Sequence, residues 1–391
     1  LFPGQPLIET VSPTYKMYPL KDITLLKILP AQGILSDRTL PVPTALSSCF
    51  ARPEGKGYER GYKMRWLPLV RAFDKDGAER GTAVWMLIYQ KPLSEGAAFQ
   101  DAVRRLIGTN NKTNPQLAAE GSMCAVCAIS DPIALKAIAG TRLFGELARR
   151  MADGVFLSHA GSLEFSYWPG EKVQLGAETV NYGEHAVALE VRVRVGVKGS
   201  KDTVFQSASK VVIKPGESVK TSFEWAPAQF EHSGYVVTTE LLREGRPIDV
   251  ISHEIGILST AKAKADAFVT TKGGDFRLEG KRWNPVGVNY WPRHTIALEQ
   301  EDYVYHWLTP GFYDPEEVDK DLSLLETMGA NFVAIRANHE NDRRTILDFL
   351  RRCRNHGIVA MVFLQSHVIS DDPHYFQGIM TPFHYQTDAV R

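Results

Sequence analysis

The sequence predicts a multidomain protein in which an α+β region is followed by an all-β part and then by a parallel α/β part. Its 391 residues are more than one hydrophobic core usually accommodates. The hydrophobic period changes to two near residue 161, and beyond residue 262 apolar strands alternate with helices. We therefore place the domain boundaries at residues 1–160, 161–262 and 263–391.

The composition limits the kinds of partner. The 45 Lys and Arg residues balance 45 Asp and Glu residues, so no net charge attracts a nucleic acid or an anionic membrane. No segment approaches the roughly 18 consecutive apolar residues of a membrane span. We therefore expect no nucleic-acid partner and no membrane span. The sequence starts at Leu1 with neither Met nor a signal-peptide pattern, and we expect its natural N-terminus to lie upstream.

The first part mixes strands and helices, and its pattern indicates no particular chemistry. "RWLPLVRAF" and "TAVWMLIYQ" flank a turn at Asp76-Gly77, as in a β-hairpin. "FQDAVRRLIG" has the spacing of a short amphipathic helix, and "SMCAVCAIS" is an apolar run typical of a buried strand. The role of residues 1–160 stays open.

One longer helix is predicted at the end of this part. It begins at Asp131-Pro132 and stops at Gly154, which are residue types typical of a helix start and a helix end. Its apolar residues recur at helical spacing: Leu135, Ile138, Leu143, Leu147 and Met151.

Four cysteines in so long a chain do not indicate a disulfide framework. Cys124 and Cys127 form a CxxC motif, a spacing that can bind zinc in other contexts. In a strand, positions three apart point to opposite faces, which prevents joint coordination of a metal. We therefore expect two ordinary buried cysteines, and we expect neither a metal nor a cofactor.

The second part consists of alternating segments of strand length, separated by Gly, Pro and Asn. Six or seven strands in about a hundred residues, without a Cys pair, predict an immunoglobulin-like β-sandwich that lacks its disulfide. Such sandwiches host many functions, so we expect a spacer or rigid bracket. The segments are "KVQLGAETVNYG", "AVALEVRVRVGV", "SKVVIKPGE", "SVKTSFEWAP", "GYVVTTELLREG" and "PIDVISHEIGIL".

After the link "AKAKADAF", strands and helices alternate. The strand "PVGVNY" precedes a helix that has Asp314 as N-cap, Pro315 at its first position and Gly329 just past its end. Its predicted apolar stripe is Val318, Leu322, Leu325 and Met328.

The strand "NFVAIRA" follows, and after it a second helix that ends at Gly357 and is followed by the strand "IVAMVFLQSH". Ile346, Leu350 and Cys353 share one face of this helix. Strands that are apolar on both faces and joined by helices predict a parallel sheet. The pattern allows an open doubly wound sheet or a (β/α)8 barrel, and no GxGxxG or P-loop follows any of these strands.

Three segments of the third part resemble the opening of the catalytic domain in retaining (β/α)8-barrel glycoside hydrolases: "FRLEGKRWNPVGVNYWP", "DLSLLETMGANFVAIR" and "ILDFLRRCRNHGIVAMVFLQSH". The similarity is to the cellulase and mannanase type of family five and to the β-galactosidase and β-glucuronidase type of family two. The hairpin "F-x-L-x-GK" is the usual lead-in of that clan, and a preceding sandwich resembles the layout of family two. The resemblance covers roughly residues 275–391 and implies the first three βα units of an incomplete TIM barrel.

The resemblance implies a sugar site at the carboxyl ends of the strands, where such barrels place their active site. Asn289, Tyr290 and Trp291 would line its first-strand edge, because Trp stacks on the apolar face of a pyranose while amides and hydroxyls bond its OH groups. The alternative is that Tyr290 and Trp291 only plug the top of the barrel.

Three further residues are implied by the same resemblance. Arg336, at the end of the second strand, matches an arginine that holds the nucleophilic carboxylate ionised; a structural ion pair on the rim is the alternative. His367, after the third strand, matches a position that contacts the substrate or the nucleophile's surroundings, unless it is simply solvated. Asn338 lies in the second loop with His339 and Glu340, within reach of a substrate.

Retaining hydrolysis needs two carboxylates about 5 Å apart. In the clan they follow strands four and seven, and this sequence contains three of the strands. We therefore expect the acid/base and the nucleophile to lie beyond Arg391, so that the chain is a fragment of a larger enzyme and does not itself cleave glycosides. The resemblance also implies an oligosaccharide or polysaccharide substrate and a secreted or periplasmic location.

Two alternatives stay open. A non-catalytic carbohydrate-binding or scaffold protein with a degenerate barrel would carry neutral residues at the positions of the catalytic carboxylates. An α/β oxidoreductase or transferase would need a phosphate-binding glycine loop. The glycan, the linkage, exo or endo action and the oligomeric state are not predicted.

Overall fold

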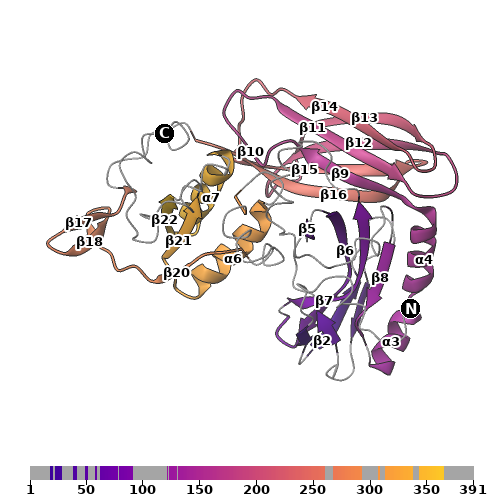
Figure 1. Ribbon diagram of the computed structural model, residues 1–391, viewed down its shortest axis with the longest axis horizontal. Coiled ribbons are helices and arrows are strands. Elements are labelled where there is room, and N and C mark those ends of the chain that lie inside the picture. Colours follow the sequence, from indigo (N-terminus) through magenta and orange to yellow (C-terminus); the bar gives the residue numbers. More distant parts are fainter. Residues whose placement is uncertain are drawn as a thin grey trace, which may run out of the picture.

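The protein is a mixed α/β, multidomain chain made mostly of strands, in which four helices are described (Figure 1). The computed structural model describes residues 18–20, 23–28, 38–41, 49–51, 58–59, 62–77, 79–90, 121, 123–129, 131–259, 267–292, 307–308, 313–337 and 343–364. No helix within these ranges is long and apolar enough to span a bilayer.

The N-terminal part is a sheet with the strand order β3-β2-β6-β7-β8, to which β5 adds by pairing with β6. The predicted hairpin is confirmed, because β6 and β7 pair antiparallel. The Gly77 amide donates to the Asp74 carbonyl over 3.1 Å, and Gly77 has a positive φ of 78°, which glycine adopts without strain. The strands are β2 Ile23–Ile28, β3 Arg38–Pro41, β5 Tyr58–Glu59, β6 Tyr62–Asp74, β7 Glu79–Gln90 and β8 Met123–Cys127, and β1 Tyr18–Leu20 pairs separately with β4 Cys49–Ala51.

The single helix predicted from residue 131 to residue 154 is wrong, because the structure has two helices, α3 Pro132–Ala139 and α4 Leu143–Asp153. The break falls at the weak helix formers Gly140 and Thr141 and at Arg142, whose positive φ of 68° is not helical. The Thr141 amide and hydroxyl both donate to the Ile138 carbonyl there. The predicted start at Asp131 and end at Gly154 are confirmed. The helix expected over residues 99–108 lies outside the described residues.

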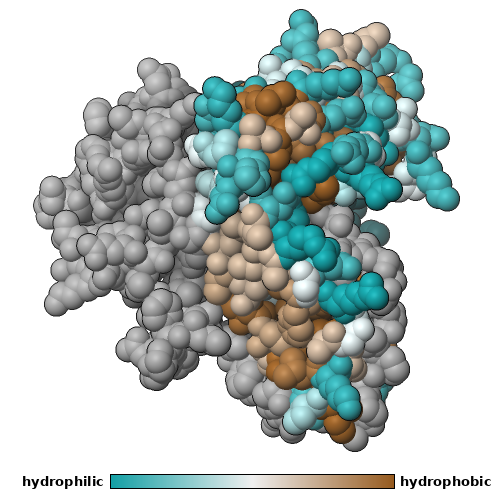
Figure 2. Space-filling model, turned by 90° about the vertical axis from the view of Figure 1, so that its right-hand side faces the viewer, coloured by the Kyte–Doolittle hydropathy of each residue, from teal (hydrophilic) through white to brown (hydrophobic). Residues whose placement is uncertain are grey.

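The two helices cover one side of the N-terminal sheet (Figure 1). Ile138, Leu143 and Leu147 are buried against strand residues such as Leu69 and Met86. In Figure 2, which views the side where α3 and α4 lie, tan and brown residues gather over this lower part, whereas the sandwich above shows teal residues around a brown patch.

Cys124 and Cys127 lie on β8 opposite Leu87 and Val84. The expectation that both are buried is wrong: Cys124 is half-buried and Cys127 is exposed, because β8 ends the sheet. Cys124, Cys127 and Cys353 are free thiols, and no cluster of metal-ligating side chains is found in the described part of the chain.

The middle part consists of two sheets packed face to face, with the strand orders β10-β16-β15-β12-β13 and β14-β11-β9. The predicted alternation is confirmed, for example on β12, where Val191, Val193 and Val195 are buried. Its first strand begins at Val155, ahead of the expected boundary. The strands are β9 Val155–Ser162, β10 Ser166–Tyr167, β11 Val173–Asn181, β12 Val187–Val197, β13 Thr203–Ile213, β14 Ser218–Trp225, β15 Gly234–Arg243 and β16 Arg246–Ile257.

Charged side chains join α4 to the sandwich. Asp153 accepts hydrogen bonds from both terminal nitrogens of Arg243, over 2.9 and 3.1 Å. The buried Asp249 carboxylate accepts from the Leu157 amide over 2.8 Å, and Arg150 lies 3.8 Å away. The N-terminal part and the sandwich therefore share a bonded junction.

The C-terminal part confirms the predicted parallel strands joined by helices. The strands β20 Gly287–Asn289, β21 Phe332–Ala337 and β22 Val359–Leu364 pair in parallel and in this order. In the described part of the chain this sheet has three strands and no barrel is formed. The helices are α6 Pro315–Thr327 and α7 Arg343–Asn355, and the preceding hairpin contains β17 Thr270–Lys272, β18 Asp275–Leu278 and β19 Lys281–Arg282.

The ends of α6 follow the prediction, but its apolar stripe is shorter. Asp314 Oδ1 accepts hydrogen bonds from the amides of Glu316 and Glu317, and Pro315 occupies the first position. Val318 and Leu322 are buried, whereas Met328 is 79% exposed because it lies past the last turn that faces the sheet.

Candidate functional site

The two faces of the parallel sheet have different surroundings. The register aligns Asn289 with Ala334 and aligns Arg336 with Phe363. Neighbours in register share a face. Val333, Ile335 and Ala337 point to the opposite face, where they are buried against α6 and α7. Asn289 and Arg336 therefore lie on the face that the helices leave uncovered, which we call the open face.

The open face combines polar and apolar groups that are accessible to solvent. Asn289 and Arg336 are exposed, and Met361 and Phe363 are 51% and 50% exposed. The Arg336 guanidinium carbon is 6.0 Å from the centroid of the Phe363 ring. A fixed cation beside an aromatic face offers donors together with an apolar platform, a combination that suits polar, ring-shaped ligands.

Tyr290 lies on the opposite side of the sheet from Asn289, because successive strand residues alternate. Its ring stacks on Phe349 at 5.7 Å and meets Trp307 edge-on at 5.6 Å. Its hydroxyl donates to Asp321 Oδ2 over 3.2 Å. This placement gives Tyr290 a packing role between the sheet and the helices.

Of the other site residues predicted from the sequence, the structure describes Trp291 and leaves the rest undescribed. Trp291 follows the first strand and is 37% exposed. Asn338 and His367, together with His339 and Glu340, lie outside the described residues. The structure thus brings Asn289 and Arg336 onto one face, and it does not describe the positions of Asn338 and His367.

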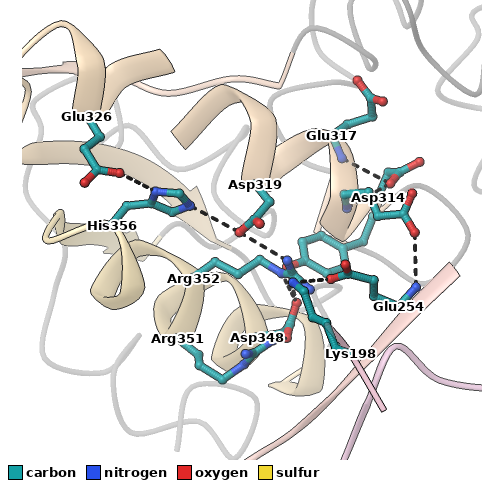
Figure 3. A network of polar contacts seen from close by, with 12 residues as sticks. Lys198, Glu254, Asp314, Glu317, Asp319, Glu326, Asp348, Arg351, Arg352 and His356 are labelled. Carbon is teal, nitrogen blue, oxygen red and sulfur yellow. Dashed lines mark hydrogen bonds and ion pairs between the residues drawn. The ribbon is translucent and has the colours of Figure 1, made fainter. Parts of the chain in front are cut away.

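Sequence reasoning missed a buried polar cluster beneath the sheet (Figure 3). Asp348 is 0% exposed and accepts hydrogen bonds from Tyr313 over 2.7 Å, Arg351 over 2.6 Å and Arg352 over 2.8 Å. Burial opposes ionisation of Asp348, but the two arginines outweigh it and lower the pKa of its carboxyl group. Burial, assisted by the Asp348 charge, raises the pKa of Tyr313 well above its ordinary value. The cluster therefore holds an ionised carboxylate under the strands.

The spacing of this cluster was readable in the sequence. Asp348, Arg351 and Arg352 stand at i, i+3 and i+4 on α7, a spacing that places them on one helix face. Their burial was not readable, because charged residues at this spacing usually form a solvated face. Tyr313, which precedes α6, supplies the third hydrogen bond.

The α/β part docks on the sandwich through a second set of bonds. Both terminal nitrogens of Arg344 bind Glu171, over 2.7 and 3.1 Å, and one also donates to the Ser166 carbonyl over 2.8 Å. This bidentate hydrogen bonding lowers the pKa of Glu171. Glu316 accepts from the Glu254 amide over 3.1 Å. These contacts fix α6 and α7, and with them the sheet that carries the open face, relative to the sandwich.

Comparison with known proteins gave no matching family model and no matching curated protein. Among solved structures the chain is similar to a β-glucuronidase from Bacteroides uniformis, with 20% identity, a TM-score of 0.27, and coverage of 54% of this chain and 23% of that one. A glycosyl hydrolase family 2 member from Bacteroides cellulosilyticus has 14% identity and a TM-score of 0.25, with coverage of 53% and 25%.

A third similar structure is a cycloisomaltooligosaccharide glucanotransferase from Paenibacillus sp., with 13% identity, a TM-score of 0.26, and coverage of 57% of this chain and 30% of that one. The chain thus spans less than a third of the length of each of these proteins. The likeness is distant and partial, and it includes glycoside hydrolases of family 2.

Proposed function

We propose that the chain is part of a glycoside hydrolase that acts on β-linked carbohydrate by a retaining two-carboxylate mechanism. In this proposal the α/β part is the start of a (β/α)8 barrel, and the acid/base and the nucleophile lie outside the 391 residues. The observation that carries the proposal is that Asn289 and Arg336 lie on the same open face, on the neighbouring parallel strands β20 and β21. The motifs of the third part add the resemblance on which the assignment to glycosidases rests.

The chemistry of these side chains supports a sugar ligand. The Asn289 amide can both donate to and accept from a sugar hydroxyl. The Arg336 guanidinium stays charged and lowers the pKa of a carboxylate placed beside it, as a nucleophile requires. Phe363 and Trp291 offer exposed aromatic surface on which the apolar face of a pyranose can stack.

The remaining parts have supporting roles in this proposal. The two-sheet sandwich, expected over residues 161–262 and beginning with β9 at Val155, is an immunoglobulin-like bracket. Its bonds to Arg344 and Glu316 hold the barrel segment in place. Residues 1–160 form an accessory region. A secreted or periplasmic location follows from the proposed substrate class.

The test is binding of β-linked oligosaccharides, for which no catalytic carboxylate is needed. We would titrate the 391-residue chain with cello- and manno-oligosaccharides by isothermal calorimetry, and repeat the titration with Arg336→Ala and Asn289→Ala. Loss of a hydrogen bond to a charged group should weaken binding about tenfold in the first variant, and loss of a neutral one about threefold in the second.

Arg354→Ala is the matched control, because Arg354 is an exposed arginine in the last turn of α7 and not on the open face. It should bind as the parent does. Equal loss in Arg354→Ala and Arg336→Ala, or no binding of any oligosaccharide to the parent, would contradict the proposal.

A further inference from the structure

His356 stands between two carboxylates of the neighbouring helix. It follows α7, and its ring faces α6 (Figure 3). Nδ1 lies 2.7 Å from Glu326 Oε2, and Nε2 lies 3.3 Å from Asp319 Oδ1. Carboxylate oxygens only accept hydrogen bonds, so each ring nitrogen must carry a proton for both contacts to be hydrogen bonds.

The number of bonds therefore depends on the protonation of the ring. The imidazolium form has two N–H donors and can bind Glu326 and Asp319 together, whereas neutral imidazole has one donor and can bind only one of them. The released carboxylate then faces a ring nitrogen lone pair, which repels it. Deprotonation thus removes one of the two hydrogen bonds that join the His356 ring to α6.

The charged groups around the ring favour this arrangement. Asp319 and Glu326 come from α6, and Arg352 comes from the helix that His356 follows. Arg352 contacts the same Asp319 oxygen over 3.2 Å, so this carboxylate lies between two nitrogen donors of the α7 end. Arg352 also binds the buried Asp348, so the ring is connected to Asp348 through Asp319 and Arg352.

We propose that Glu326, His356 and Asp319 form a proton-operated latch between α6 and α7, closed when the His356 ring is doubly protonated and half-released when it is neutral. The latch is independent of the proposed carbohydrate site. It lies at the turn that leads from α7 into β22, where the Ile358 amide donates to the Cys353 carbonyl over 2.8 Å. Release of the latch loosens this turn.

The experiment is amide hydrogen exchange of the 391-residue chain, measured by NMR at pH 5.5 and pH 8.5 and corrected for the intrinsic exchange rates. The informative amides are those of His356 and Ile358, which are bonded at the end of α7. Partly exposed ion pairs contribute modestly to stability. We therefore expect the protection of these amides against exchange to fall about two- to fivefold from pH 5.5 to pH 8.5. In His356→Gln, which does not titrate, this fall should vanish.

Two further variants make the test specific. Glu326→Gln removes one carboxylate of the latch and should reduce the fall, since His356 is the partner of Glu326. His185→Gln changes an exposed histidine of the sandwich and should leave the fall unchanged. A fall of the same size in His356→Gln and the parent, no fall in the parent, or an undiminished fall in Glu326→Gln would overturn the proposal.

Discussion

The buried Asp348 should be the most sensitive ionisable residue of the α/β part. Asp348→Asn keeps the shape of the side chain but removes the charge that compensates Arg352, which is 3% exposed. Removing one partner of a buried ion pair costs about 3–5 kcal/mol, because the other charge stays buried without compensation. Arg352 keeps its contact with Asp319 at 3.2 Å, and Arg351 is partly exposed. We therefore expect Asp348→Asn to lower the free energy of opening α7 by about 3 kcal/mol, the lower end of this range.

The assay must report on the α/β part alone, because a multidomain chain does not unfold in two states. Hydrogen exchange of the slowest α7 amides measures the free energy of opening this helix. Asp319→Asn is the control, since Asp319 also contacts Arg352 but is half-buried, and it should cost about 1 kcal/mol or less. If Asp348→Asn cost no more than Asp319→Asn, the reasoning that Asp348 compensates buried charge would be refuted.

Three further predictions concern the same region and the proposed site. Because the pKa of Asp348 is lowered, its contribution to stability is present above its unfolded pKa of about 3.9 and is lost as the pH falls through the lower folded value. The protection of the α7 amides against hydrogen exchange should therefore decline with acid in the parent, but much less in Asp348→Asn. Arg336→Lys in the complete enzyme should reduce turnover far more than it reduces stability, because Lys lacks the planar fork that holds a carboxylate, and normal kinetics would remove Arg336 from the site. Trp291→Ala should weaken oligosaccharide binding by about 1–3 kcal/mol, by analogy with stacking of bases on aromatic side chains; unchanged affinity in calorimetry would leave Trp291 a packing residue.

Local signals in the sequence were sufficient where a single residue type determines the backbone. Asp314 and Gly154 were placed correctly at helix ends, because capping and positive φ depend on neighbours in the chain. Strand periodicity was likewise sufficient for the sandwich and for the parallel pairs. The prediction of a single helix across Gly140 and Thr141 failed because both halves carry helical periodicity, which does not reveal the left-handed backbone of Arg142, with a φ of 68°, between them.

The site was predictable only in part, because it depends on contacts between distant segments. That Asn289 and Arg336 share a face follows from register, which the sequence of either strand alone does not contain. The packing role of Tyr290 depends on Trp307 and Phe349, which are distant from it in the sequence. The buried state of Asp348 likewise depends on Tyr313, which no helical pattern reveals.

The proposed function places carbohydrate on the open face of the parallel sheet. The most direct measurement is methyl NMR of the 391-residue chain during titration with a β-linked oligosaccharide. Shift changes should appear at Ala334 and Met361, which lie on the open face, and not at Val333 and Ile335, which are buried against the helices. Changes confined to Val333 and Ile335, or no changes at Ala334 and Met361 at saturating sugar, would contradict the claim.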